Sequence, residues 1–235
     1  MNKNSTHIMV ILDRTGSMEP IRDDTIGGFN TFLDQQQQQP GEATMTLVQF
    51  DSQDPYEIIH HWQDVQKVTP LSRETYVPRA RTPLFDAMGR GINDLEQNLS
   101  VLGPQEKPAK ILVVVVTDGQ ENASREFRHR DIVRMIAEKS KKGWQFVYLS
   151  ADMDAIAEAR SVGFERRSTL AFQKDAQGSR QVWDSLSQKT AAYRESILEN
   201  AEFAFDEEDR HHPDDPGKEE NQKGKPSKEA GKPGV

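Results

Sequence analysis

Near the start of the chain, the spacing of the apolar residues predicts first a strand and then a helix. Residues 7–12 (HIMVIL) form a short apolar run with three β-branched side chains, and the run stops at Asp13. Such a run predicts a strand that is buried on both faces of a parallel sheet. At 21–33 the apolar residues recur at helical spacing, and Pro40-Gly41 marks the end of this predicted helix. A strand followed directly by a helix is typical of an α/β fold.

The next segment predicts a β-hairpin. Residues 44–50 (TMTLVQF) alternate between apolar and polar side chains, which predicts a strand. Residues 51–55 have the composition of a turn, and residues 56–62 form a second strand-like segment. Two strands joined by so short a turn pair antiparallel, so we expect one short antiparallel strand at the edge of the sheet.

The strongest strand pattern lies further along the chain. After an irregular stretch with several prolines at 68–83, helical spacing returns at 84–99. Six consecutive aliphatic residues then occupy positions 111–116, and Thr117-Asp118-Gly119 closes the run. An unbroken aliphatic run predicts a central strand that helices cover on both faces.

The rest of the chain continues the alternation of helices and strands. We predict a helix at 132–136, a strand at 146–149, a helix at 155–159, a strand at 170–172 and a last amphipathic helix at about 178–203. This alternation predicts an α/β fold of the doubly wound type, in which an open, mostly parallel sheet has helices on both faces. The hairpin adds the short antiparallel strand at one edge.

The chain divides into one domain and a tail. Its 235 residues suit a single α/β domain, which we expect at 1–205. Residues 206–235 contain no aromatic, leucine or isoleucine residue, so they cannot bury enough apolar surface to offset the entropy lost on ordering. We expect them to form a disordered, charged tail.

Composition narrows the possible classes of function. The formal net charge of −8 argues against nucleic-acid binding, which needs lysine and arginine to neutralise phosphates. The absence of cysteine excludes disulfides, thiolate catalysis and cysteine-based zinc sites. No apolar run reaches the roughly 18 residues of a membrane helix, and the apolar stretch near the start is too short for a signal peptide. We therefore expect a cytoplasmic protein that binds neither nucleic acid nor membrane.

Oxygen-bearing side chains occur where the predicted strands end. Asp13, Thr15 and Ser17 follow the first strand at alternate positions, so their side chains point the same way in an extended loop. Thr82 directly precedes a predicted helix, and Asp118 follows the central strand. Open parallel sheets bind their ligands at the carboxyl ends of the strands, so we expect these five residues to share one rim.

The residue types of this set indicate the kind of ligand. Two carboxylates and three hydroxyls, without histidine or thiol, are hard oxygen donors that favour Mg²⁺, Mn²⁺ or Ca²⁺ over zinc or copper. Mg²⁺ takes about six oxygens, and this set supplies only part of that shell. A cation held mainly by hydroxyls keeps most of its charge and attracts an aspartate or glutamate from another protein. Each motif taken alone also fits an ordinary helix cap or turn.

Together these motifs resemble the metal-ion-dependent adhesion site (MIDAS) of von Willebrand factor type A domains. The likeness covers roughly residues 7–175 and includes all five ligand positions: Asp13, Thr15, Ser17, Thr82 and Asp118. It implies a mostly parallel sheet of about six strands, hydroxyl ligands from the serine and the threonines, and carboxylates that contact the cation directly or through water. It also implies Mg²⁺ as the cofactor and a partner protein that offers an aspartate or glutamate carboxylate.

The sequence departs from the family pattern at two places. The middle hydroxyl belongs to Thr15, where the family usually has serine, and Ala80-Arg81 precede Thr82, where the family often has glycines. The Arg81 side chain either contacts an acidic partner beside the cation or points into water. The sequence around the motifs resembles that of intracellular single-domain members from bacteria and phages rather than that of secreted adhesins.

Three charged or polar residues near the same rim have two alternative roles. Asp86 and Glu121-Asn122 either support the ligand loops or belong to a helix surface. Their positions close to Thr82 and Asp118 in the sequence are compatible with both roles.

Three functions are compatible with the sequence. The first is metal-dependent binding of a partner protein, without enzymatic activity. The second is a Mg²⁺-dependent, aspartate-based phosphatase, but such enzymes need a carboxylate two residues after the nucleophile, and Thr15 occupies that position. The third is the same fold with a vestigial metal site, which binds partners through its helices or its tail.

Overall fold

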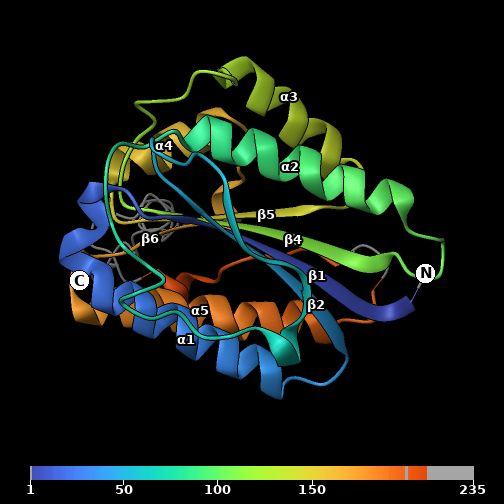
Figure 1. The fold of residues 1–235 in the computed structure, drawn as a ribbon. Helices are drawn as coiled ribbons and strands as arrows, with labels where there is room; N and C mark the ends of the chain where they lie inside the picture. The colour runs from blue at the N-terminus through green and yellow to red at the C-terminus, as the bar shows by residue number, and fades with distance from the viewer. Residues whose placement is uncertain (1, 199–200, 211–235) are drawn as a thin grey trace, which may run out of the picture.

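The computed structural model describes residues 2–198 and 201–210, and its centre is a six-stranded sheet (Figure 1). The strands are β1 (Asn2–Asp13), β2 (Glu42–Phe50), β3 (Glu57–Asp64), β4 (Pro108–Thr117), β5 (Gln145–Ser150) and β6 (Thr169–Ala171). They are arranged in the order β3-β2-β1-β4-β5-β6. All neighbours are parallel except β2 and β3, which form the antiparallel hairpin at one edge. The predicted fold class is therefore confirmed.

Helices cover both faces of this sheet. In the described residues the α-helices are α1 (Arg22–Gln38), α2 (Leu84–Val101), α3 (His129–Ser140), α4 (Met153–Ser161) and α5 (Ala176–Glu195). Short 3-10 helices are η1 (Gly16–Ile21), η2 (Val65–Lys67), η3 (Arg166–Ser168) and η4 (Glu207–Asp209). α1 and α5 lie on one face of the sheet, and α2, α3 and α4 lie on the other (Figure 1). In the part of the chain that is described, none of these helices has both the length and the apolar composition needed to cross a membrane.

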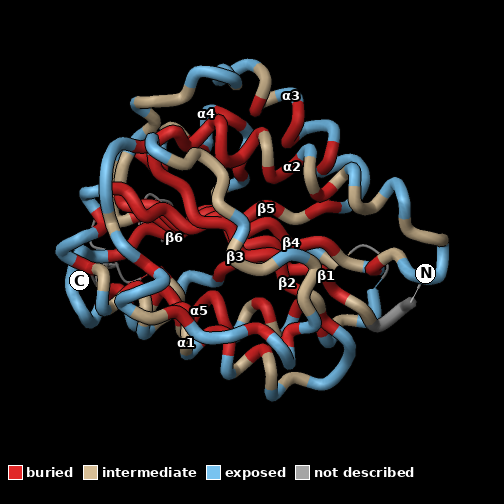
Figure 2. The backbone as a smooth tube through the Cα atoms, in the orientation of Figure 1, coloured by how far each residue is buried: buried red, intermediate tan, exposed pale blue. Residues whose placement is uncertain are grey.

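The central strands contribute to two hydrophobic cores, one on each face of the sheet. Ile8 and Val10 of β1 pack in the core beside α1 and α5, whereas Met9 and Ile11 pack in the core beside α2, α3 and α4. Successive strand residues point to opposite faces, so a strand covered on both sides is apolar at most positions. The aliphatic run at 111–116 meets this requirement in β4. Figure 2 shows the buried residues concentrated in the sheet and on the helix faces that cover it.

The last helix ends earlier than its periodicity predicts. α5 stops at Glu195 rather than near position 203, and Ile197 is 95% exposed. Lys110 of β4 donates hydrogen bonds from Nζ to the carbonyl oxygens of Tyr193 (2.7 Å) and Arg194 (2.9 Å). A cation that pairs with these carbonyls stabilises the end of the helix at this point. The prediction of a longer helix was wrong because Lys110, which decides its end, is distant in sequence.

The segment that follows α5 returns to the body of the protein. Phe203 and Phe205 are buried in the core beside α5. Lys189 of α5 forms an ion pair with Asp206. The first residues of the expected tail, 206–210, therefore lie against the domain. The remainder of that expected tail, 211–235, lies outside the described residues.

Candidate metal site

Asp13 is held in a fully buried position at the end of β1. The backbone N–H of Thr15 donates to its Oδ1 (2.6 Å), and the Thr117 hydroxyl at the end of β4 donates to its Oδ2 (2.5 Å). The Tyr76 hydroxyl donates to the backbone oxygen of Asp13 (2.5 Å) from the irregular segment between β3 and α2. Thr15 and Thr117 thus fix the carboxylate of Asp13, and Tyr76 fixes its backbone, at the carboxyl end of the sheet.

The hydroxyls of the loop after β1 lie beside Asp118. Ser17 Oγ donates to Asp118 Oδ1 at 2.6 Å and lies 3.1 Å from Thr15 Oγ1. The N–H of Gly16, between the two hydroxyl residues, donates to the carbonyl oxygen of Ala80 (3.1 Å). β1 and β4 are neighbours in the sheet, so the loops that follow them meet at the same rim.

Thr82 joins this cluster from the loop before α2. A Cβ built on Gly119 would lie 3.7 Å from Ser17 Oγ and 3.9 Å from Thr82 Oγ1, so both hydroxyls flank Gly119. Asn122 holds Thr82 in place, because its Oδ1 accepts the Thr82 N–H (3.0 Å) and its own N–H donates to the Thr82 carbonyl oxygen (3.0 Å). The loop after β4 therefore positions the loop before α2.

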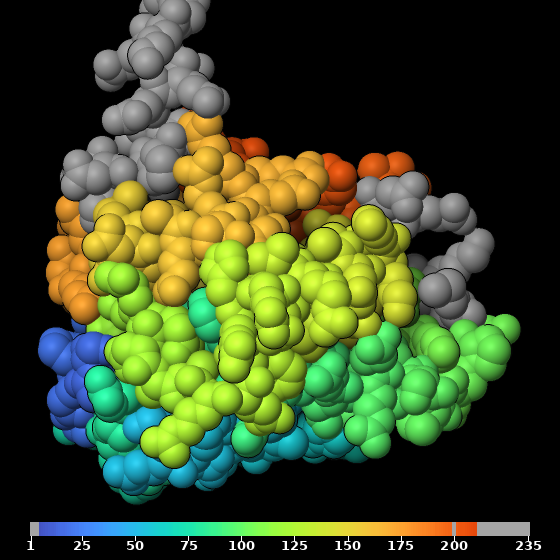
Figure 3. All heavy atoms as spheres, turned by 90° about the horizontal axis from the view of Figure 1, so that it is seen from above, coloured from blue at the N-terminus to red at the C-terminus, as the bar shows by residue number. Residues whose placement is uncertain are grey.

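The structure brings all five predicted residues to one rim of the sheet. Four of them are 3% exposed or less, and Ser17 is the exposed member of the set. In Figure 3 the blue segment around η1, the yellow-green segment after β4 and the orange segment after β6 lie side by side at the left edge of the molecule. These segments carry Ser17, Asp118 and Lys174.

Two buried carboxylates lie close together in this cluster. The pKa of Asp13 is raised to about 7, chiefly by burial and to a smaller extent by the charge of Asp118, although the hydrogen bonds from Thr117 and Thr15 act to lower it. Asp118 is 1% exposed, and its Oδ2 is buried without accepting a hydrogen bond. Lys174 Nζ lies 2.9 Å from this oxygen, which makes the contact an ion pair without hydrogen-bond geometry. A cation at the rim would offset this concentration of buried negative charge.

Asp86 and Glu121 support the loops of the rim. Asp86 in the first turn of α2 is 4% exposed and accepts hydrogen bonds of 2.8 to 2.9 Å from the backbone N–H groups of 125–127. Glu121 accepts a hydrogen bond from the N–H of Phe85 (2.9 Å). The two carboxylates thus tie the loop after β4 to the start of α2, where the helix dipole favours negative charge. Of the two roles left open by the sequence, the structure shows the supporting one.

An ion-pair cluster around the buried Asp51 joins the loop after β1 to the segment before Thr82. Arg14 Nε and Arg79 Nε lie 2.7 and 2.9 Å from Oδ2 of Asp51, whose side chain is fully buried. Burial raises the pKa of Asp51, but hydrogen bonds from the Gln53 N–H and the two arginines hold it below its usual value. Arg81, which directly precedes Thr82, has an exposed side chain. These ion pairs connect the loop after β1 with the segment before α2, and Arg81 adds an exposed cationic group beside Thr82.

Sequence reasoning assigned no role to Thr117, Tyr76 or Lys174. Thr117 lies in the motif that closes the central strand, so its position beside Asp118 was a signal that could have been used. Tyr76 lies in a stretch without regular structure, and Lys174 lies between β6 and α5. No motif marks either residue, and only the tertiary structure brings them to the rim.

The five residues of the rim do not form the kind of metal site that is built from three or more histidine and carboxylate side chains. Among residues 2–198 and 201–210, no three histidine, aspartate or glutamate side chains form a group that could hold a metal ion. The rim has two carboxylates, and its remaining oxygens belong to hydroxyls. Such a set fits a hard divalent cation with an incomplete shell of protein ligands.

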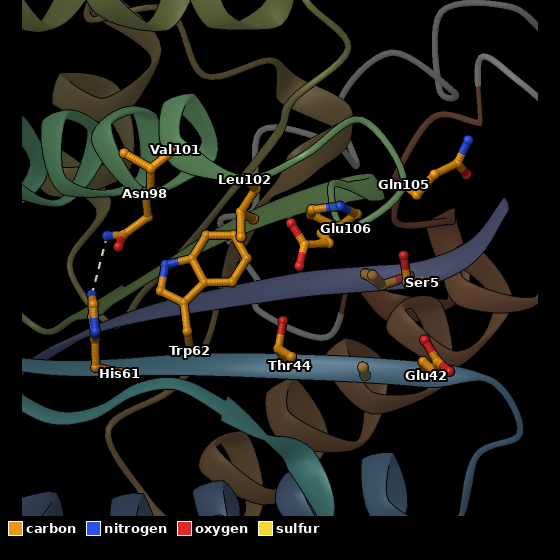
Figure 4. A pocket seen from close by; sticks show the side chains of 13 residues that line it. Ser5, Glu42, Thr44, His61, Trp62, Asn98, Val101, Leu102, Gln105 and Glu106 are labelled. Atoms are coloured by element: carbon orange, nitrogen blue, oxygen red, sulfur yellow. Dashed lines mark hydrogen bonds between the residues drawn. The ribbon is translucent and has the colours of Figure 1, made fainter. Parts of the chain in front are cut away.

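A cavity of about 530 Å³ lies at the opposite edge of the sheet, between the end of α2 and the amino ends of β1 and β2 (Figure 4). Trp62 lines it with a left-handed backbone (φ 47°), and its ring stacks on the buried His7 with centroids 3.8 Å apart. Asn98 and His61, joined by a hydrogen bond of 3.1 Å, lie on one side of the Trp62 ring, and Glu106 lies on the other (Figure 4). This mixed lining favours no single class of ligand, so the oxygen cluster remains the candidate site.

Comparison with known proteins gives a match in fold and none in sequence. No family model matches the chain, and no curated protein matches it. A von Willebrand factor type A protein from Catenulispora acidiphila has a TM-score of 0.52 at 10% identity, over 80% of this chain and 43% of the other. Proximal thread matrix protein 1 of the mussel byssus, solved with a zinc-occupied MIDAS motif, has a TM-score of 0.55 at 14% identity, over 80% and 46%. Manganese-loaded TRAP of Plasmodium vivax has a TM-score of 0.52 at 12% identity, over 74% and 70%.

At these low sequence identities, the structural matches show a shared fold and nothing beyond it. The chain has the fold of von Willebrand factor type A domains. It spans less than half the length of the mussel and Catenulispora chains that it matches.

Proposed function

We propose that this chain is a protein-interaction module that binds one divalent cation, Mg²⁺, and uses it to bind an aspartate or glutamate of a partner protein. One observation carries the proposal. Five oxygen-bearing side chains from three separate segments converge on one rim, where the buried Oδ2 of Asp118 accepts no hydrogen bond and faces the half-exposed ammonium group of Lys174. A buried carboxylate oxygen without a hydrogen bond is energetically costly. The half-exposed ammonium group offsets part of this cost, and a divalent cation at the rim would offset more of it.

The cation would be held by the five residues of the rim: Asp13, Thr15, Ser17, Thr82 and Asp118. Three of these ligands are neutral hydroxyls, so the bound cation supplies a positive centre for a carboxylate from outside. Ser17 is the exposed member of the set, and we place the approach of the partner on its side. Asp86, Glu121 and Asn122 keep the rim in shape when a partner binds.

The comparisons support a divalent cation in this fold. The structure of the mussel protein has a zinc-occupied MIDAS motif, and the TRAP structure is manganese-loaded. For this chain we favour Mg²⁺, with Mn²⁺ or Ca²⁺ as alternatives, because its own donor set consists of carboxylate and hydroxyl oxygens.

Thermal unfolding of the full chain in Mg²⁺ and in chelator tests the cation site. A ligand that binds only the folded state stabilises it by about 2.7 kcal/mol at a hundred times its Kd. For a domain of this size that gain raises the Tm by about 5–10 °C. We expect Asp13→Asn to lose this response. Asp34→Asn, an exposed aspartate of α1, is the matched control and should keep it. If wild type responds to neither Mg²⁺ nor Mn²⁺, the proposal fails and the vestigial alternative is favoured.

A pull-down from the native host tests the partner contact. We expect wild-type bait to retain a partner in Mg²⁺ and to release it in chelator, and we expect Asp13→Asn bait to retain none. Replacing the aspartates and glutamates of the captured partner one at a time should then identify a single residue whose loss abolishes binding. A partner that binds equally well in chelator contradicts the proposed mode of binding.

A further inference from the structure

Lys174 brings a positive charge to the rim from the segment that joins β6 to α5. Its Nζ lies 2.9 Å from Asp118 Oδ2, while Asp118 Oδ1 accepts the hydrogen bond from Ser17 at 2.6 Å. The Asp118 side chain is fully buried, and the Lys174 side chain is 44% exposed. One oxygen of this carboxylate therefore belongs to the hydroxyl cluster, and the other faces an ammonium group at the surface.

The backbone on both sides of Lys174 is held by hydrogen bonds. The Phe172 N–H donates to the carbonyl oxygen of Ser150 at the end of β5 (3.0 Å). The Asp175 side chain accepts the Gly178 N–H (2.7 Å) and so caps α5. These bonds place the start of the lysine side chain beside the rim. Its long, flexible stem lets the ammonium group move between Asp118 and water.

We propose that Lys174 is a tethered competitor of the divalent cation. Its ammonium group pairs with a carboxylate that also helps to hold the cation, and the cation binds by displacing it. This inference rests on the proposed function and adds a residue that sets the affinity of the site. Two cations at one carboxylate repel each other, and the half-exposed side chain has solvent to move into. The lysine thus makes the site weaker and more readily reversible than five oxygens alone would be.

A purely structural role for Lys174 predicts the opposite change in affinity. If the lysine only kept the loops of the rim in shape, its loss would disorder the ligands and weaken cation binding. If it competes with the cation, its loss strengthens cation binding. The sign of the change in Kd therefore separates the two roles.

Isothermal titration of the full chain with MgCl₂ measures this sign. We expect Lys174→Met to bind Mg²⁺ about tenfold more tightly than wild type, which is the scale on which one nearby charge acts at a partly exposed site. Lys174→Arg keeps the charge and should bind close to the wild-type Kd. Lys141→Met, which removes an exposed lysine at the end of α3, is the matched control and should leave the Kd unchanged.

The possible outcomes separate this inference from the proposed function. If wild type binds Mg²⁺ and Lys174→Met binds it equally well or more weakly, the inference is overturned and the proposed cation site stands. Absence of Mg²⁺ binding in every variant overturns both.

A measurement in chelator tests the ion pair without the metal. Lys174→Met should lower the Tm of the wild-type chain, because it leaves a buried carboxylate without its counter-charge, and it should have little effect in an Asp118→Asn background. Equal effects of Lys174→Met in the two backgrounds would show that the ammonium group does not pair with Asp118, and the inference would fall.

Discussion

Replacing Asp86 by asparagine tests how the rim is supported. Asp86 Oδ1 accepts hydrogen bonds from the N–H groups of Glu126 and Phe127, and its Oδ2 accepts the N–H of Arg125. Asparagine keeps one accepting oxygen and replaces the other by an amino group, which can only donate. At least one of the three bonds is therefore lost, and a backbone donor is left facing another donor.

The size of the effect follows from these contacts. An unsatisfied buried donor costs about 1–3 kcal/mol. The two remaining bonds also weaken, because their acceptor is no longer charged. We expect the free energy of unfolding of Asp86→Asn to fall by about 3 kcal/mol. For a domain of this size, such a loss lowers the Tm by about 6–12 °C.

Guanidinium denaturation followed by circular dichroism measures this change. Asp34→Asn on the exposed face of α1 is the control for the loss of one aspartate charge. An exposed change of this kind shifts the free energy of unfolding by no more than about 0.5 kcal/mol. If Asp86→Asn also stays within about 0.5 kcal/mol of wild type, Asp86 does not support the loop after β4 and the reasoning is refuted.

Three further changes test other parts of the structure. Tyr76→Phe removes the hydroxyl that donates to the Asp13 backbone oxygen, and we expect a loss of about 1–2 kcal/mol in the same assay; no loss would mean that this bond adds nothing to stability. Gly28→Ala places a Cβ 2.0 Å from the Trp183 ring between α1 and α5, so we expect destabilisation by about 1–3 kcal/mol or more, and a neutral result would contradict the packing. Burial lowers the pKa of His7 from 6.5 to about 3, so between these values the unfolded chain binds a proton that the folded chain does not. The free energy of unfolding should therefore fall as the pH drops from about 6.5 toward 3, less steeply in His7→Phe, and equal slopes in the two proteins would contradict this assignment.

The candidate ligands could be located from the sequence because their positions relative to the strands carry the information. Asp13 and Asp118 each follow an apolar run, and a run buried in a parallel sheet determines the edge at which its end lies. The order of elements was also predictable, since helical and strand periodicities alternate clearly from residue 7 to residue 172. The exposure of Ser17 could not be predicted, because it depends on the tertiary packing around η1.

The remaining features depend on contacts between residues that are distant in sequence. Lys110 stabilises the end of α5 by donating hydrogen bonds to the carbonyl oxygens of Tyr193 and Arg194. The helical spacing of the apolar residues continues past that point, so it does not mark the end of the helix. The pairing of Lys174 with Asp118 joins two loops that no motif relates. The role of Asp86 depends on the backbone of 125–127, whose N–H groups no side-chain pattern reveals.

The most direct test of the central claim is to count the Mn²⁺ ions that bind to each chain, by following the electron paramagnetic resonance signal of free Mn²⁺ during titration. The account predicts one saturable site per chain, from which Mg²⁺ displaces Mn²⁺, and its loss in both Asp13→Asn and Asp118→Asn. A wild-type chain without such a site, or variants that bind Mn²⁺ as well as wild type does, would contradict it.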